Sequence, residues 1–186
     1  LYYCPQIWCS DESDPAQRMD IQFNTSLGYP LSAIASHVND SKVAPYATKA
    51  ALALFGTYGY EMNPNVLTET EVSDLAAHAE LYRKYHRDII ERGTLYHLCA
   101  PHTGNYMCMQ CVSQDKSTSL VVFMNKLKEL EQFRFLKLRG LDGKKRYYNT
   151  LDGHTHTGEY YMRVGLNLSG GWLTEFSHKL ILLTEE

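Results

Sequence analysis

The hydrophobic pattern of this chain changes its period once, near Arg92 and Gly93, and this change limits the folds open to it. Before that point, helical patterns alternate with short apolar runs, which is typical of a parallel sheet built from β-α units. After it, the runs are short, rich in Val, Leu, Tyr and Phe, and separated by turns, which indicates an antiparallel β-sandwich. We therefore predict two domains, over residues 1–93 and 94–186.

The first half is predicted to begin with a buried strand that is broken near Pro5 and contains residues 1–3, 7 and 8. A helix follows, with Asp14 as N-cap, Pro15 as first helical residue and Gln17 as reciprocal capping partner. Gly28 is expected to end this helix. Its inward stripe is predicted to consist of Ala16, Met19, Phe23 and Leu27.

Two further strand and helix pairs are predicted before the change of period. The strands are expected at 32–38 and 58–62, and an Ala-rich helix at 45–55 should end at Gly56. Thr68 and Glu71 form a capping box for a long helix that Gly93 ends. The inward stripe of this helix is predicted to be Val72, Leu75, Ala79, Tyr82, His86 and Ile89, with His86 a packed histidine with a bonded ring nitrogen.

The second half is predicted to be all β. Strands are expected at 95–99, 106–112, 119–127, 133–138, 146–149, 160–164 and 178–183. Turns are expected at 141–143, 151–153 and 169–171. The basic segment from Lys137 to Arg146 is interpreted as a solvated hairpin.

Three carboxylates lie between the first strand and the first helix, at Asp11, Glu12 and Asp14. Barrel enzymes place acid/base chemistry in such loops after strands. Like charges packed closely disfavour ionisation of one of them, which suits a proton donor. Asp14 is explained by its cap role, whereas Asp11 lies outside the helix and has no such role. Asp11 is therefore the candidate acid/base, with a solvated loop carboxylate as the alternative.

The residues around this loop carry a more specific pattern: Pro5-Gln6-Ile7-Trp8, Ser10-Asp11, Asp14 and Arg18, continued by 21–22, 25–27, 29–30, 35–38, 59–62 and 82–87. The chain thereby resembles glycoside hydrolase family 36, the retaining alpha-galactosidases, and the likeness reaches Gly165, Leu166, Phe176 and the terminal strand. In that family a W-T-S-D-x-T-D segment carries the general acid/base at its first Asp. The sequence departs from this pattern at Cys9, Glu12 and Ser13, and the stretch at 39–43 is shorter than the family's loop.

The resemblance implies a fold and a set of roles. The fold is the C-terminal part of a (β/α)8 TIM barrel followed by an antiparallel β-sandwich. Asp11 inherits the acid/base role. The supporting residues are Trp8, which flanks the sugar or supports the loop, Ser10 and Arg18, which hold and tune that loop, and Asp14 and His37, with His37 supporting the active-site wall.

The family's nucleophile follows a Lys-Trp-Asp pattern that is absent from these residues. A retaining glycosidase needs two carboxyl groups about 5 to 5.5 Å apart, and a complete barrel takes about 250 residues. We therefore expect the chain to be the C-terminal part of a larger enzyme, inactive by itself. Unpaired strand edges of a partial barrel also predict that the isolated chain aggregates.

The expected substrates of the parent enzyme are terminal alpha-galactosides, namely melibiose and raffinose-type oligosaccharides. The resemblance implies no metal or organic cofactor and a homo-oligomeric parent. Two alternatives within the enzyme class stay open: a raffinose-synthase-like transglycosylase and an alpha-N-acetylgalactosaminidase. An alternative of another class is a non-catalytic carbohydrate-binding or assembly module.

Composition narrows the partners. The 18 Lys and Arg are outnumbered by 21 Asp and Glu and form no continuous basic stripe, which disfavours nucleic-acid binding. No apolar run is long enough to span a membrane. Cys108 and Cys111 would point to opposite faces of a strand, which disfavours zinc. The odd count of five Cys favours reduced thiols and a cytoplasmic enzyme. His154 and His156 are expected to face solvent.

Overall fold

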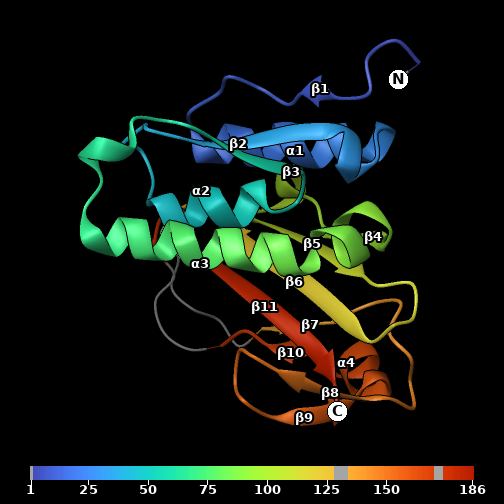
Figure 1. The fold of residues 1–186 in the computed structure, drawn as a ribbon. Coiled ribbons are helices and arrows are strands. Elements are labelled where there is room, and N and C mark those ends of the chain that lie inside the picture. Colours follow the sequence, from blue (N-terminus) through green and yellow to red (C-terminus); the bar gives the residue numbers. More distant parts are fainter. Residues whose placement is uncertain (1, 128–133, 170–173) are drawn as a thin grey trace. The chain divides into compact units, whose positions relative to one another are not determined.

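The computed structural model describes residues 2–127, 134–169 and 174–186 (Figure 1). Leu1, the first residue of the strand predicted at 133–138 and most of the turn predicted at 169–171 lie outside the described residues. The chain divides into two compact units, Leu1–Glu91 and Arg92–Glu186.

The first unit contains a parallel sheet with strand order β1-β2-β3, formed by Ile7–Trp8, Ile34–Asn39 and Thr57–Glu61. Helix α1 (Pro15–Gly28) connects β1 to β2, and α2 (Tyr46–Ala53) connects β2 to β3. Short 3-10 turns lie at Leu31–Ala33 and Pro64–Val66. Helix α3 (Glu69–Tyr85) continues as a π-helical turn, His86–Glu91. The predicted alternation of strands and helices, with parallel pairing, is confirmed.

The start of the chain is not the buried strand that the sequence predicts. Tyr2 and Tyr3 are 91% and 94% exposed, and only Ile7–Trp8 pairs with β2. The reason is that β1 is an edge strand, so among the described residues it has a neighbour on one side only.

Helix α1 begins as predicted, because the Asp14 side chain accepts a hydrogen bond from the Ala16 N–H at 2.8 Å and Pro15 is the first helical residue. The reciprocal role expected of Gln17 is wrong: the Asp14 N–H donates to Glu12 Oε1 at 2.9 Å instead. The predicted apolar stripe is also incomplete. Leu27 is 63% exposed, while the buried face of the helix includes the polar side chains of Arg18, Gln22 and Ser26.

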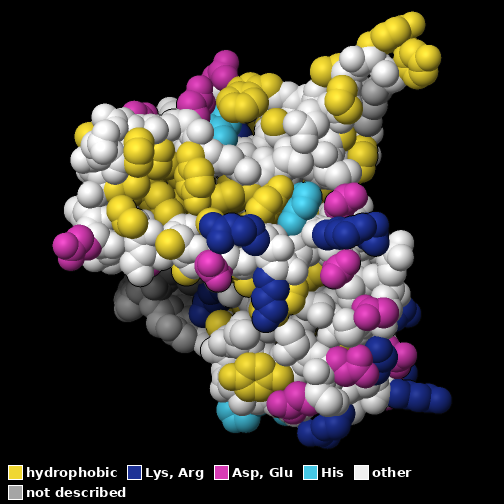
Figure 2. Space-filling model, in the orientation of Figure 1, with side chains coloured by type: hydrophobic (Ala, Val, Ile, Leu, Met, Phe, Trp, Pro, Cys, Tyr) yellow, Lys and Arg dark blue, Asp and Glu magenta, His cyan; other side chains and the backbone are white. Residues whose placement is uncertain are grey.

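Helix α3 has the predicted capping box between Thr68 and Glu71. Its stripe differs from the prediction, because Val72 is 49% exposed, whereas Leu75 and Ile89 are buried. Val72 lines a shallow apolar pocket of about 320 Å³, and Figure 2 shows apolar side chains gathered in this part of the first unit.

The ring of His86 lies against Tyr82, with ring centroids 4.3 Å apart. Its Nε2 is buried without a hydrogen-bond partner among the described residues.

The second unit is an antiparallel β structure, as predicted. A six-stranded sheet has the order β4-β5-β6-β11-β8-β9, and a two-stranded sheet pairs β10 with β7. The six-stranded sheet is formed by β4 (Thr94–Cys99), β5 (Tyr106–Val112), β6 (Thr118–Asn125), β11 (His178–Glu185), β8 (Arg146–Asn149) and β9 (Thr155–Thr157). The small sheet is formed by β7 (Phe135–Leu136) and β10 (Leu166–Asn167). A 3-10 turn lies at Pro101–Thr103.

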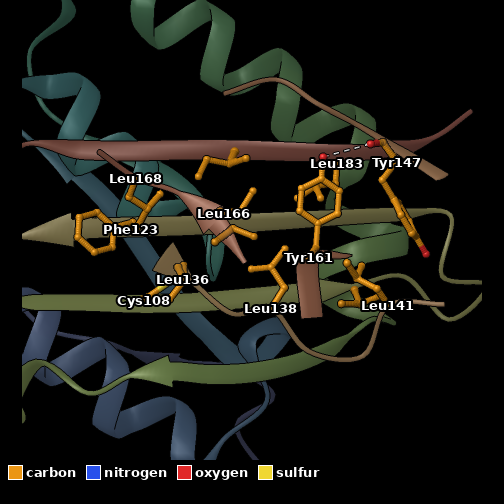
Figure 3. Close-up of a cluster of buried hydrophobic side chains, with 13 residues drawn as sticks. Cys108, Phe123, Leu136, Leu138, Leu141, Tyr147, Tyr161, Leu166, Leu168 and Leu183 are labelled. Carbon is orange, nitrogen blue, oxygen red and sulfur yellow. Dashed lines mark hydrogen bonds between the residues drawn. The ribbon is translucent and has the colours of Figure 1, made fainter. Parts of the chain in front are cut away.

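The core of the second unit gathers side chains from both sheets and from helix α4 (Gly158–Arg163) (Figure 3). It includes Cys108 and Phe123 from the large sheet, Leu136 and Leu166 from the small one, and Tyr161 from α4. Strands β5 and β6 are buried almost continuously along both faces. Such strands give near-continuous apolar runs, which explains why the sequence marks them clearly.

The strand predicted at 160–164 is wrong, because these residues belong mostly to α4. The Thr157 hydroxyl caps this helix by accepting from the Tyr160 N–H at 3.2 Å. Gly158 allows the first turn of this helix to lie against the Asp142 carbonyl oxygen. Any other residue would place its Cβ 2.0 Å from that oxygen. The predicted basic hairpin is also wrong, because the strands on either side of it, β7 and β8, belong to different sheets.

The thiols and the paired histidines of the second unit lie in different surroundings. Cys108 and Cys111 are buried in β5, and this burial raises the pKa of both thiols. His154 is 72% exposed, as expected, whereas His156 is partly buried against the ring of Tyr160. Within the described ranges, no three His, Cys, Asp or Glu side chains gather as metal ligands. Among all the described residues of the chain, no helix has the length and apolar character needed to cross a bilayer.

Candidate active site

The carboxyl ends of the three parallel strands meet at one edge of the first unit's sheet. The strand register pairs Trp8 with Ala35, His37 with Gly59 and Asn39 with Glu61. Because side chains alternate along a strand, Trp8, His37 and Glu61 share one face of the sheet. The other face carries residues such as Val38, which packs in a cluster with Tyr46 and Ala50 of α2. The shared face is therefore the one opposite this helix.

Asp11 lies in the exposed loop that follows β1. The Cys9 N–H donates to the Ala35 carbonyl at 3.0 Å, which extends the β1-β2 pairing into the start of this loop. The indole N–H of Trp8 donates to Asp11 Oδ1 at 2.6 Å. Trp8 is 52% exposed, so this pair of side chains lies at the surface of the described chain.

Trp8 rests on the ring of His37. The two ring centroids are 4.4 Å apart and the planes differ by 11°, which is a parallel stack. His37 Nδ1 lies 3.3 Å from a terminal guanidinium nitrogen of Arg18. A guanidinium only donates, so Nδ1 accepts, and a neutral His37 carries its proton on Nε2. That nitrogen lies 2.9 Å from Glu61 Oε2, at ion-pair distance but outside hydrogen-bonding geometry.

Arg18 connects the loop to this histidine. It extends from the first turn of α1, is only 6% exposed, and donates to the carbonyl oxygens of Ser10 and, at 3.4 Å, Glu12. Burial lowers the pKa of Arg18, against the attraction of Cys9, Asp11 and Glu61. Burial and the Arg18 charge lower the pKa of His37, against Glu61 and Asp11. The site therefore holds a cation beside a neutral imidazole at neutral pH.

The three carboxylates of the loop have separate partners. Glu12 Oε1 accepts from the Ser13 and Asp14 N–H groups at 2.8 and 2.9 Å, and Asp14 Oδ1 accepts from the Ala16 N–H. The Ser10 hydroxyl accepts from the Glu12 N–H at 2.9 Å. Glu12 and Asp14 therefore fix the backbone, whereas Asp11 is held by a side chain on the open face of the sheet.

The structure brings together five of the six residues singled out by sequence: Trp8, Ser10, Asp11, Arg18 and His37. Asp14 caps the helix behind them. Sequence reasoning missed Glu61 as a neighbour of this group. Its signal was available, since a charged residue at the end of an apolar strand lies at the edge where parallel strands present their chemistry.

Comparison with known proteins identifies the family to which the chain belongs. Residues 1–93 match the family model described as Melibiase, and residues 106–183 match the Glycosyl hydrolase family 36 C-terminal domain. Both descriptions are of glycoside hydrolases. The chain is 34% identical over 175 residues to the bifunctional alpha-galactosidase/sucrose kinase AgaSK of Mediterraneibacter gnavus, covering 90% of this chain and 19% of that protein. It is 37% identical over 154 residues to alpha-galactosidase AgaA of Geobacillus stearothermophilus, covering 79% and 21% respectively.

Solved structures show the same likeness along the whole chain. A variant of Geobacillus stearothermophilus AgaA in complex with raffinose superposes with a TM-score of 0.93 at 32% identity, covering 100% of this chain and 26% of that one. The alpha-galactosidase from Lactobacillus brevis superposes with a TM-score of 0.90 at 28% identity, covering 100% and 27%. The chain belongs to glycoside hydrolase family 36. It spans about a fifth to a quarter of the length of these relatives.

Proposed function

We propose that this chain forms the last β-α units of a (β/α)8 catalytic barrel and the C-terminal β-sandwich of a retaining alpha-galactosidase. The substrates are terminal alpha-galactosides such as melibiose and raffinose-type oligosaccharides. The observation that carries this proposal is the Asp11 carboxylate, held by Trp8 at the carboxyl end of β1 on the open face of the sheet. Barrel enzymes build their active sites at this end of their strands. The alpha-galactosidase names of the relatives and the raffinose complex support the substrate class.

The reaction proceeds in two steps with one carboxylate from this chain. In the first, a carboxylate from the rest of the polypeptide attacks the anomeric carbon. The bond to the glycosidic oxygen breaks, and Asp11 gives that oxygen its proton. In the second, Asp11 takes a proton from water as the water oxygen attacks the anomeric carbon and releases the nucleophile. Two inversions at the same carbon give net retention.

The contact with Trp8 decides which oxygen of Asp11 carries the proton. An indole N–H only donates, so it binds an oxygen with a free lone pair and stabilises Oδ1 in the unprotonated state. The proton therefore resides on Oδ2, which is left to face the glycosidic oxygen. Arg18 and Ser10 keep the loop backbone in place, so that Oδ2 stays in one direction.

The test is to replace Asp11 with Ala in the full-length polypeptide and compare two substrates. A sugar leaving group needs protonation, so kcat/KM for raffinose should fall by about 10²- to 10⁴-fold. The kcat/KM for 4-nitrophenyl alpha-galactoside, which reports only the first step, should fall much less, because its phenolate leaves without a proton. Asp74→Asn, at an exposed position of α3, is the control and should retain both activities. Raffinose hydrolysis that survives Asp11→Ala would overturn the assignment.

Further assays of the same full-length polypeptide test the alternative functions that the sequence leaves open. Product analysis separates hydrolysis, which releases free galactose, from transfer of galactose to a second sugar. Parallel assays with alpha-N-acetylgalactosaminides test whether the enzyme is instead an alpha-N-acetylgalactosaminidase. A full-length polypeptide that binds raffinose without cleaving it would instead indicate a carbohydrate-binding module.

A further inference from the structure

Glu61 ends β3, two strands away from the strand that leads to Asp11, and lies on the same open face of the sheet. Its side chain is 60% exposed, yet one carboxylate oxygen lies 2.9 Å from Nε2 of the buried His37. We propose that Glu61 is a positioning residue for the acid/base, acting through His37 and Trp8 on Asp11. This inference rests on the proposed function and names a residue that the reaction depends on without touching the reacting atoms.

The first link is the orientation of the His37 ring. Arg18 lies beside Nδ1 and Glu61 lies beside Nε2, so the neighbours of the two ring nitrogens carry opposite charges. If the ring turned over, the carbons Cδ2 and Cε1 would take the places of Nδ1 and Nε2, so the contacts with Arg18 and Glu61 would both be lost. Glu61 therefore favours a single orientation of the imidazole.

The second link is the stack between His37 and Trp8. Strand β1 contains only two residues, and Trp8 is 52% exposed, so the indole lies at the surface of the described chain. The His37 ring lies parallel to it at 4.4 Å between centroids. A change in the tilt of His37 would open this stack on one side. The direction of the indole N–H, which ends 2.6 Å from Asp11 Oδ1, therefore depends on His37.

The experiment compares Glu61→Ala and Glu61→Gln in the full-length polypeptide. The quantity measured is the ratio of kcat/KM for raffinose to kcat/KM for 4-nitrophenyl alpha-galactoside. This ratio does not change with the fraction of folded enzyme, so a loss of stability cannot imitate the effect. A misplaced acid lowers kcat/KM for raffinose most, because its sugar leaving group needs a proton. Small displacements of a reacting group also have large effects on rate.

We expect Glu61→Ala to lower this ratio by about tenfold. Glu61→Gln should retain most of it, because the amide oxygen can still face His37 Nε2. The matched control is Glu80→Ala, which removes an exposed carboxylate paired with Arg83 on α3 and should leave the ratio unchanged.

Equal losses on both substrates, or no loss, in Glu61→Ala would overturn the inference, as would a Gln variant as impaired as the Ala variant. Failure of the proposed function is seen separately. It would show as an Asp11→Ala enzyme that still cleaves raffinose, whatever the Glu61 variants do.

Discussion

Each unit of the molecule contains a glutamine that is fully buried, and the two side chains are used differently. Gln22 of α1 donates to the carbonyl oxygens of Leu52 and Phe55 at 2.8 and 2.9 Å and accepts from the Ser36 hydroxyl at 3.0 Å. Gln110 of β5 exchanges two hydrogen bonds of 2.9 Å with the Arg139 backbone and donates to the Ser119 hydroxyl at 3.0 Å. Gln22 ties helices to one face of a sheet, whereas Gln110 ties a sheet to an irregular connection.

This difference shows what each unit leaves available for chemistry. In the first unit, buried contacts gather on the helix side of the sheet, so the opposite face keeps Trp8 and Glu61 accessible. In the second unit, β5 and β6 are buried along both faces. A sheet covered on both faces gains stability from packing but presents few side chains to a substrate. If the proposed function holds, the first unit carries the reaction, and the burial of β5 and β6 stabilises the second.

The largest effect on stability should come from the two strands that are buried along both faces, β5 and β6. Phe123 is 1% exposed and belongs to the core of the second unit. Replacing it with Ala should lower the free energy of unfolding of this unit by about 3–5 kcal/mol, because a cavity remains where the ring was. Hydrogen exchange, followed peptide by peptide, measures this loss in each unit separately. Faster exchange confined to peptides of the first unit would contradict the comparison.

The two glutamines should give the next largest effect. Gln22→Leu and Gln110→Leu keep the volume of the side chain but leave buried partners without hydrogen bonds. Each should therefore lower the free energy of unfolding of its own unit by about 1–3 kcal/mol. The same exchange measurement assigns each loss to a unit. A Gln22 variant that destabilised only the second unit would show that the two networks are not separate.

A smaller effect is expected from pH at the open face. Burial and Arg18 lower the pKa of His37 below its usual 6.5. The unfolded chain takes up this proton more readily than the folded one, so the contribution of the neutral ring to stability is complete above about pH 6.5. It is lost as the pH falls through the folded-state pKa. An NMR titration of the His37 ring should show a midpoint below 6.5, and Arg18→Met should raise that midpoint.

The smallest effect is expected at Leu27, which the helical pattern assigns to the core but the structure leaves 63% exposed. Leu27→Ala should change the free energy of unfolding by less than about 0.5 kcal/mol. Met19→Ala, at a fully buried position of the same helix, serves as the matched control and should cost about 2–5 kcal/mol. Similar losses of unfolding free energy at both positions would mean that the face of α1 that carries Leu27 is buried in the folded protein.

The periodicity of the sequence predicted the fold class because the strongest patterns coincide with the most buried elements. Strand β5 was placed correctly for this reason, whereas the exposed Thr68 capping box was found because its two residues lie three positions apart in the sequence. The segment at 160–164 failed because Tyr and Val favour strands in general, whereas here the Thr157 cap and the packing of Tyr161 in the core select a helix. Local propensity could not predict that outcome, because it depends on contacts with distant residues.

The candidate site was predicted where its residues are close in sequence and missed where they are not. Trp8, Ser10, Asp11 and Arg18 lie within one strand, loop and helix start, so a single motif contains them. The place of Glu61 depends on the register between β2 and β3, which brings it beside a histidine 24 positions earlier in the chain. The sequence marks Glu61 as a charged residue at a strand end, but it does not encode its pairing with His37.

The way Arg18 holds the loop has a consequence for how such enzymes can diverge. Its guanidinium binds the carbonyl oxygens of Ser10 and Glu12, groups that every amino acid possesses. The contacts that Arg18 makes with the loop are therefore independent of which side chains the loop carries, and Glu12 adds bonds of its own to the Ser13 and Asp14 N–H groups. Arg18 itself has no such latitude. A lysine would offer a compact charge in place of a planar fork, and could not span the loop and His37 together.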